Sequence, residues 1–172
     1  MERMSILDWL GLGKAPRDED DDVIHRIVRD LEAMEPAAAR YLGLFAFLLA
    51  RVANVDQEIS DTETQEMERL VEAFGGLPPA QAALVVQIAK AQNRLFGETQ
   101  NFLAARELRD LATEDQKREL LHCLFAVSAA DDSISVAEEE AVRSIARELL
   151  LTNEEYIAIR SAYREKRAVL KR

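Results

Sequence analysis

The sequence predicts an all-α protein with two pseudo-symmetric helical-hairpin repeats packed as a single bundle of about seven or eight helices. Only 6 Gly and 4 Pro occur among 172 residues, and this leaves long stretches free to form helix. Apolar residues recur at helical spacing, and nowhere do four or more residues alternate convincingly with period two. Helix-start patterns, in which Ser or Thr precedes Glu or Gln by three residues, recur along the chain.

The first two helices are predicted from their apolar spacing. Residues 23–34 carry one apolar face, made of Val23, Ile27, Val28 and Leu31. Residues 37–55 form the second helix and contain the most apolar run, residues 41–50. That run is far too short to cross a bilayer, so we expect it to be the buried central helix of the bundle.

The next two helices are bounded by Gly and Pro. A helix over residues 60–74 is expected to stop at Gly75-Gly76, because glycine commonly ends helices. Pro78-Pro79 suit the opening turn of a helix over residues 80–96, since Pro lacks the N–H that this turn leaves unpaired, and Gly97 then breaks the pattern.

The second half contains four more predicted helices. The first follows the apolar positions within residues 102–111. Thr113, three residues before a Gln, predicts a capped helix over residues 114–130. Residues 135–150 and 153–170 complete the chain.

A motif occurs twice, at residues 56–63 and 131–138. Asp, Ile, Ser and Glu recur at the same relative places, and each residue of the first copy maps 75 positions downstream, as Asp56 does onto Asp131. The flanking apolar frame repeats too: Leu49, Val52, Leu70, Val71 and Phe74 map onto Leu124, Val127, Ile145, Ala146 and Leu149. A duplicated helical unit is the simplest explanation.

Each motif has a structural interpretation as the corner of a helical hairpin. Ser60 with Glu63, and Ser135 with Glu138, fit the capping box, in which the two side chains satisfy free amides at the helix start. The preceding helix would end near the Asp. Ile59 or Ile134 would turn inward to anchor the corner.

The motif resembles that of the tellurite-resistance TerB-like domains, to which the N-terminal domain of the DjlA co-chaperone is related. The matching stretches are residues 52–56 and 127–131, where a helix ends in an Ala-containing segment and Asp. The usual Gly after this Asp is replaced by Gln57 and by Asp132. Gln tolerates a left-handed backbone less well than Asp, so the first corner is expected to differ. The resemblance covers residues 23–168.

The resemblance implies a role in a bacterial stress or envelope-associated response. We expect a non-enzymatic interaction module that is cytoplasmic, with the periphery of the inner membrane as an alternative location. The predicted organisation is an N-terminal segment and acidic linker, residues 1–22, followed by a helical domain, residues 23–172, with repeats around 41–96 and 114–170. The alternative from another class is a co-chaperone-like adaptor that binds protein without a metal.

Metal binding is the chemical hypothesis that the motifs support. The candidate ligands are carboxylates at the two corners, namely Asp56, Glu58, Glu63, Asp131, Asp132 and Glu138. Oxygen ligands suit Ca²⁺ or Mg²⁺. The EF-hand template fails, because Asp61 stands where its Gly is required and Met67 where its bidentate Glu is required. Any site would combine both corners, or one corner and another helix; the competing interpretation is that these residues only cap helices and shape turns.

Composition disfavours several other functions. The formal net charge is -10, so the protein as a whole repels nucleic acid phosphates and anionic lipid headgroups. No phosphate loop, zinc-binding His motif or nucleophile triad is visible, and His25 and His122 stand far apart. We therefore expect no enzyme activity. Cys123, the single Cys, is expected to be a buried thiol.

The two ends of the chain carry contrasting segments. Residues 5–13 are apolar and contain the only Trp; they either fold back onto the bundle or dock on a protein partner or a membrane surface. The C-terminal helix is basic at its end, with Arg160, Arg164, Lys166, Arg167, Lys171 and Arg172. This end is either solvated, where it complements the helix dipole, or a site for an acidic partner.

Overall fold

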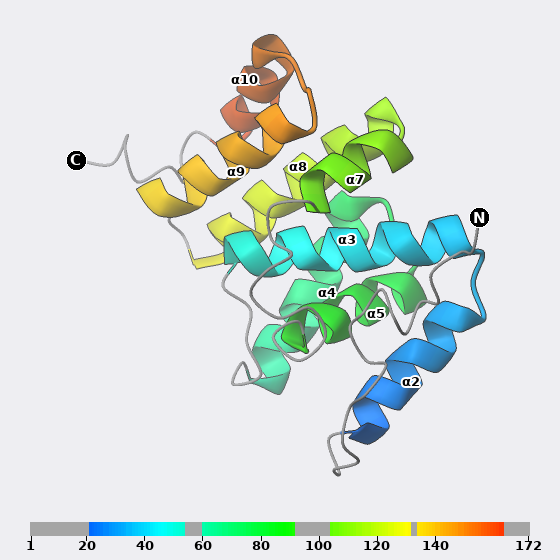
Figure 1. The fold of residues 1–172 in the computed structure, drawn as a ribbon. Coiled ribbons are helices and arrows are strands. Elements are labelled where there is room, and N and C mark those ends of the chain that lie inside the picture. Colours follow the sequence, from blue (N-terminus) through cyan, green and yellow to red (C-terminus); the bar gives the residue numbers. More distant parts are fainter. Residues whose placement is uncertain (1–20, 54–59, 92–103, 132–133, 164–172) are drawn as a thin grey trace.

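The structure is a computed structural model that describes residues 21–53, 60–91, 104–131 and 134–163, and within these residues it is all-α (Figure 1). The elements are α2 (Asp21–Glu32), α3 (Pro36–Ala53), α4 (Asp61–Gly75), α5 (Pro79–Lys90), α7 (Ala104–Leu111), α8 (Glu114–Ser128), the 3₁₀ turn η1 (Ala129–Asp131), α9 (Val136–Glu148) and α10 (Asn153–Ser161). The predicted fold class is therefore confirmed.

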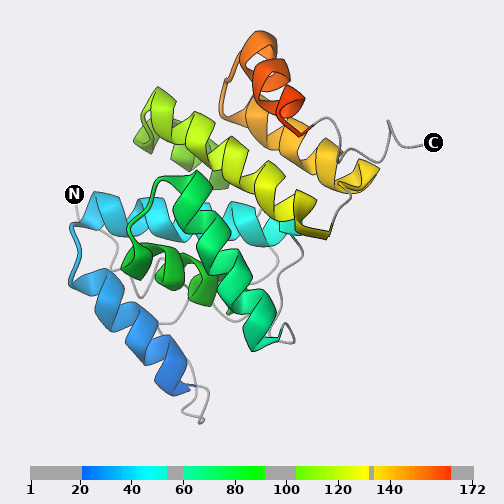
Figure 2. The ribbon, with the colours of Figure 1, turned by 180° about the vertical axis from the view of Figure 1, so that it is seen from behind.

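Helix α3 forms the centre of the bundle, as its apolar sequence predicts. It contacts α2, α5, α7, α8 and α9, and the residues from Tyr41 to Ala50 are all buried. Figures 1 and 2 show α2 at one end of the molecule and α10 at the other, with α3 between them. Helix α4 packs against α5 and α8, and α10 packs against α8.

In the described part of the chain, α3 is also the one helix whose length and composition would allow it to cross a membrane. It has 18 residues, more than the apolar run alone, and 67% of its apolar window is buried inside the protein. Helix α3 contacts five other helices, as expected for the core helix of a bundle.

Most predicted helix boundaries lie within one or two residues of the observed ones. Gly76 takes a left-handed conformation with φ 66° after α4, and Pro79 opens α5, as predicted. The last helix is shorter than predicted, because α10 ends at Ser161 and residues 162 and 163 form a turn. The remainder of that prediction, residues 164–170, lies outside the described residues, as do residues 54–55 and 92–96 of two other predicted helices.

The repeated apolar frame is buried in both halves, with one difference. Leu49, Val52, Leu70 and Val71 are buried, as are Leu124, Val127, Ile145, Ala146 and Leu149, but Phe74 is 41% exposed. Helix ends also recur at the 75-residue offset: α3 ends at 53 and α8 at 128, while α4 begins at 61 and α9 at 136. Helix α4 packs against α8, and α9 packs against α3. These features agree with duplication; the pseudo-symmetry of the two repeats stays a prediction.

Candidate functional site

The serine of each motif caps a helix, as the sequence predicts. At the first motif, the Glu63 amide donates to Ser60 Oγ over 3.1 Å, and the Ser60 amide donates to Glu63 Oε2 over 2.9 Å. The Thr64 hydroxyl donates to the Ser60 carbonyl over 2.9 Å, and Lys90 Nζ reaches Thr64 Oγ1 over 3.3 Å from α5. The start of α4 is thus held by its own cap and by a cation from the next helix.

The second motif repeats the cap. The Glu138 amide donates to Ser135 Oγ over 3.0 Å, and the Ser135 amide donates to Glu138 Oε1 over 3.1 Å. Ile134 is fully buried, as predicted for the anchoring residue, whereas Ile59 lies outside the described residues. In both motifs the Glu therefore uses one carboxylate oxygen as a cap and has a second oxygen for other contacts.

Most of the predicted metal ligands lie where the structure gives no side-chain description. Asp56, Glu58 and Asp132 are outside the described residues, and Asp131 closes η1 with its side chain undescribed. Among the side chains that are described, no group of three or more His, Cys, Asp or Glu residues is arranged to hold a metal ion. The ligand set predicted from the sequence thus stays a prediction.

The helices that lead into the two motifs meet in space. Helices α3 and α8 contact one another, and in Figures 1 and 2 they converge toward their C-terminal ends. Arg51, in the last turn of α3, forms an ion pair of 3.5 Å with Glu148, the last residue of α9. The chain therefore enters residues 54–59 and residues 132–133 from neighbouring points.

A protein-family model identifies the family of the chain that contains these two motifs. The family model described as tellurite resistance protein TerB matches residues 43–161, from within α3 to the end of α10. The chain belongs to the TerB family. The TerB match contains both serine-capped motifs, which confirms the resemblance seen in the sequence; the relation to DjlA stays a prediction. No curated protein and no solved structure gave a match.

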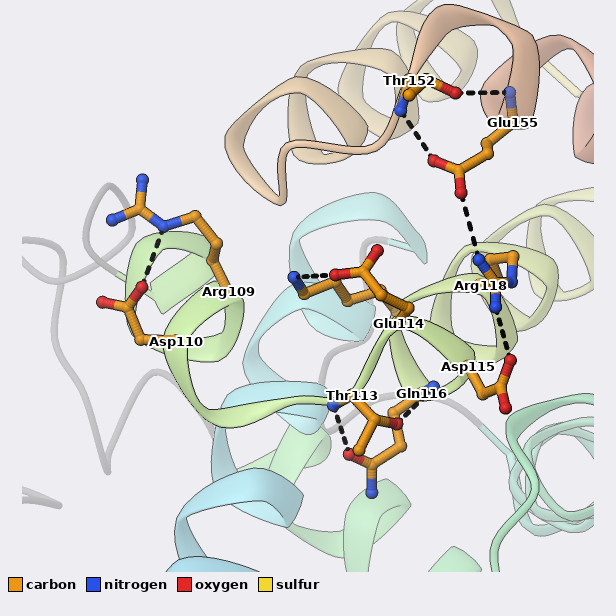
Figure 3. A network of polar contacts seen from close by, with 10 residues as sticks. Arg109, Asp110, Thr113, Glu114, Asp115, Gln116, Arg118, Thr152 and Glu155 are labelled. Carbon is orange, nitrogen blue, oxygen red and sulfur yellow. Dashed lines mark hydrogen bonds and ion pairs between the residues drawn. The ribbon is translucent and has the colours of Figure 1, made fainter.

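A second polar cluster of this TerB protein was missed by sequence reasoning. It joins the starts of α8 and α10 (Figure 3). Thr113 and Gln116 form the predicted capping box of α8, and Thr152 and Glu155 form another at α10. Arg118 Nη1 donates to Glu155 Oε1 over 3.1 Å and so links the two. The Thr-x-x-Glu spacing at residue 152 was the signal that could have revealed the second box.

Burial shifts the pKa values of three titratable groups of this TerB protein. Cys123 is fully buried, as predicted, and burial raises the pKa of its thiol to about 12. His122 is half-buried, and burial lowers the pKa of its imidazole. The Tyr163 hydroxyl donates to the His122 carbonyl over 3.0 Å, and burial raises the Tyr163 pKa to about 12. His25 is exposed on α2, as expected.

Proposed function

We propose that this TerB protein is a non-enzymatic interaction module of a bacterial stress or envelope-associated response, and that one Ca²⁺ or Mg²⁺ ion bound between its two acidic corners adjusts its binding surface. The observation that carries this proposal is the convergence of α3 and α8, which enter the two motifs from neighbouring points. Tellurite itself is not proposed as a substrate.

The chemistry of the corners supports a hard divalent cation. In the sequence, Asp56 and Glu58 follow α3, and Asp131 and Asp132 follow α8. Oxygen-only ligand sets favour Ca²⁺ and Mg²⁺. Grouped carboxylates repel each other, and a divalent ion relieves that repulsion. Glu63 and Glu138 are further candidate ligands, because each uses only one carboxylate oxygen in its cap and the second oxygen could bind the ion.

A thermal-shift experiment tests the proposal. We expect millimolar Ca²⁺ or Mg²⁺ to raise the melting temperature, because a ligand at about 100 times its Kd stabilises the folded state by about 2.7 kcal/mol. Combining Asp56→Asn with Asp131→Asn should abolish this rise. Asp30→Asn with Asp110→Asn is the matched control, since it removes the same charge from exposed positions on α2 and α7. A melting temperature independent of metal would reject the ion site.

The second candidate function is a metal-independent adaptor, and a specific observation favours it. Val136, Leu150, Ile157 and Phe74 are large apolar side chains that remain exposed, with exposed fractions of 57%, 67%, 39% and 41%. Leu150, in the turn after α9, and Ile157 on α10 lie close together in the sequence and are exposed apolar residues suited to contact a protein partner, whereas Val136 lies at the other end of α9.

Partner capture separates the two functions. The adaptor predicts that Asp56→Asn with Asp131→Asn leaves the set of captured proteins unchanged and that Leu150→Asp with Ile157→Asp abolishes it. The metal-dependent module predicts that the Asn pair, or a chelator added to the wild type, changes the captured set.

A further inference from the structure

A pocket between α9 and α10 has a chemical character opposite to that of the whole chain. It has a volume of about 310 Å³ and is lined by Arg143, Ala146, Arg147, Leu151, Asn153, Tyr156, Ile157 and Arg160. Three of these residues are arginines and none is acidic, in a chain whose net charge is -10. This volume is at the lower end of the range for small-molecule sites.

The three arginines are unequally neutralised. Arg160 Nη1 lies 3.8 Å from Glu139 Oε1, a carboxylate that is itself buried. Arg143 and Arg147 form no ion pair of 4 Å or less with any carboxylate in the described part of the chain. They stand four residues apart, so they lie on the same face of α9. Glu139 and Glu140 on the same helix act electrostatically on Arg143 and offset part of its charge, but three guanidinium groups still line the pocket, which suits an anion.

Tyr156 forms an aromatic surface under the cations. The centres of the Arg143 and Arg160 guanidinium groups lie 5.6 Å and 5.5 Å from the centroid of its ring. Tyr156 is only 4% exposed, and its buried hydroxyl forms no hydrogen bond with any residue in the described part of the chain. The hydroxyl lies beside Arg143 and raises the pKa of that guanidinium.

The turn between the two helices supplies an apolar wall. The Leu151 amide donates to the Ala146 carbonyl, and the Leu150 amide donates to the Arg147 carbonyl, both over 3.0 Å. This is the Schellman ending of a helix, which places Leu151 against Ala146. Leu151 is 8% exposed, and Ile157 at the rim is 39% exposed. Asn153 lies at the first position of α10, whose first turn also holds Glu154 and Glu155 and is capped by Thr152.

We propose that this pocket binds a small phosphate monoester, with its phosphoryl group held by Arg143 and Arg147 and its organic part against Leu151 and Ile157. A phosphoryl group carries close to two negative charges at neutral pH, and three arginines line the pocket. Planar guanidinium groups bind its oxygens in bidentate fashion. None of the residues that line this pocket is a proposed metal ligand. Phosphate binding and metal binding can therefore be tested independently.

Calorimetric titration of the full chain with phenyl phosphate tests the proposal. We expect saturable binding in the millimolar range or tighter, and at least about tenfold weaker binding after Arg143→Gln with Arg147→Gln. The matched control, Arg69→Gln with Arg109→Gln, removes the same charge from α4 and α7 and should change the affinity by less than about twofold. Ile157→Glu, a change at an exposed position, should weaken binding to a similar extent as the pocket pair by placing an anion at the rim.

Two further probes identify the source of the phosphoryl group. Inorganic phosphate should bind at least about tenfold more weakly than phenyl phosphate, because it lacks a part that contacts the apolar wall. Equal affinity for the two would overturn the ester assignment. The proposal also fails if phenyl phosphate does not saturate, if the Arg143 and Arg147 pair binds it as wild type does, or if the protein binds only vesicles that contain phosphatidic acid.

Discussion

Arg118 and Glu155 connect two helix starts that are 37 residues apart in the chain. Arg118 Nη1 donates to Glu155 Oε1 over 3.1 Å, while the other oxygen of Glu155 accepts the Thr152 amide over 2.8 Å. Arg118 also pairs with Asp115 in its own helix. One carboxylate therefore caps α10 and ties it to α8, as Figure 3 shows.

The first prediction concerns the pH dependence of this link. The Thr152 backbone amide, together with the Thr152 and Arg118 side chains, lowers the pKa of Glu155. A carboxyl group with a lowered folded-state pKa stabilises the protein above its unfolded pKa, and this contribution is lost as the pH falls through the folded pKa. Glu155→Gln should therefore lower the melting temperature at neutral pH and have a shrinking effect below about pH 4.

The neighbouring change Glu154→Gln is the matched control for that measurement, because it removes the same charge from an exposed position in the same turn. A pH-independent difference between wild type and Glu155→Gln would contradict the assigned role of the carboxylate charge.

The second prediction concerns the serine caps of the two motifs. Ser60→Ala and Ser135→Ala each leave a helix amide without its acceptor, and each should lower the free energy of unfolding by about 1 kcal/mol. Urea denaturation measures this change. Ser144→Ala, in the interior of α9, is the control and should be neutral or slightly stabilising, because Ala is the better helix former. Equal free energies of unfolding for Ser60→Ala, Ser135→Ala and Ser144→Ala would contradict the capping role of the two serines.

The third prediction compares two residues with a left-handed backbone. Gly76 has φ 66° and Leu150 has φ 61°, each just after the end of a helix. Gly76→Ala should lower the free energy of unfolding by about 1 kcal/mol, since a Cβ is strained there. It would also lie 2.6 Å from Glu119 Oε2, which has to move. Leu150→Gly should have the opposite sign and raise this free energy by up to about 1 kcal/mol, as thermal unfolding would reveal.

The fourth prediction concerns the reactivity of Cys123. Its thiol is fully buried and has a pKa raised to about 12, so the reactive thiolate is scarce at neutral pH. We expect a thiol reagent to label the folded protein only as fast as the protein unfolds, and to label it at once in denaturant. Fast labelling of the native protein at pH 8 would show that Cys123 is not a sequestered core residue.

Helix starts were predictable from sequence because their causes are local. Ser60, Thr113 and Ser135 each cap a helix through a residue three positions away, and all three boxes are present in the structure. The end of α10 at Ser161 was not predicted, because helical spacing in the sequence continues beyond it. Neither Gly nor Pro, the residues that most often mark a helix end, follows Ser161.

The long-range parts of the site were not predictable in the same way. The Arg118 to Glu155 link depends on how α8 and α10 pack, which no local pattern encodes. The arginine pocket had one available signal, the four-residue spacing of Arg143 and Arg147, but the approach of Arg160 and Tyr156 from the next helix required the fold. Burial of the apolar frame followed the repeat except at Phe74.

The central claim is that the two acidic corners form one ion site, and the stoichiometry of divalent ion binding tests it most directly. Calorimetric titration with Ca²⁺ and with Mg²⁺ should give one ion per chain for at least one of the two metals, with binding lost in Asp56→Asn alone and equally in Asp131→Asn alone. Two independent ions, each removed by only one of these substitutions, or no heat of binding for either metal, would contradict it.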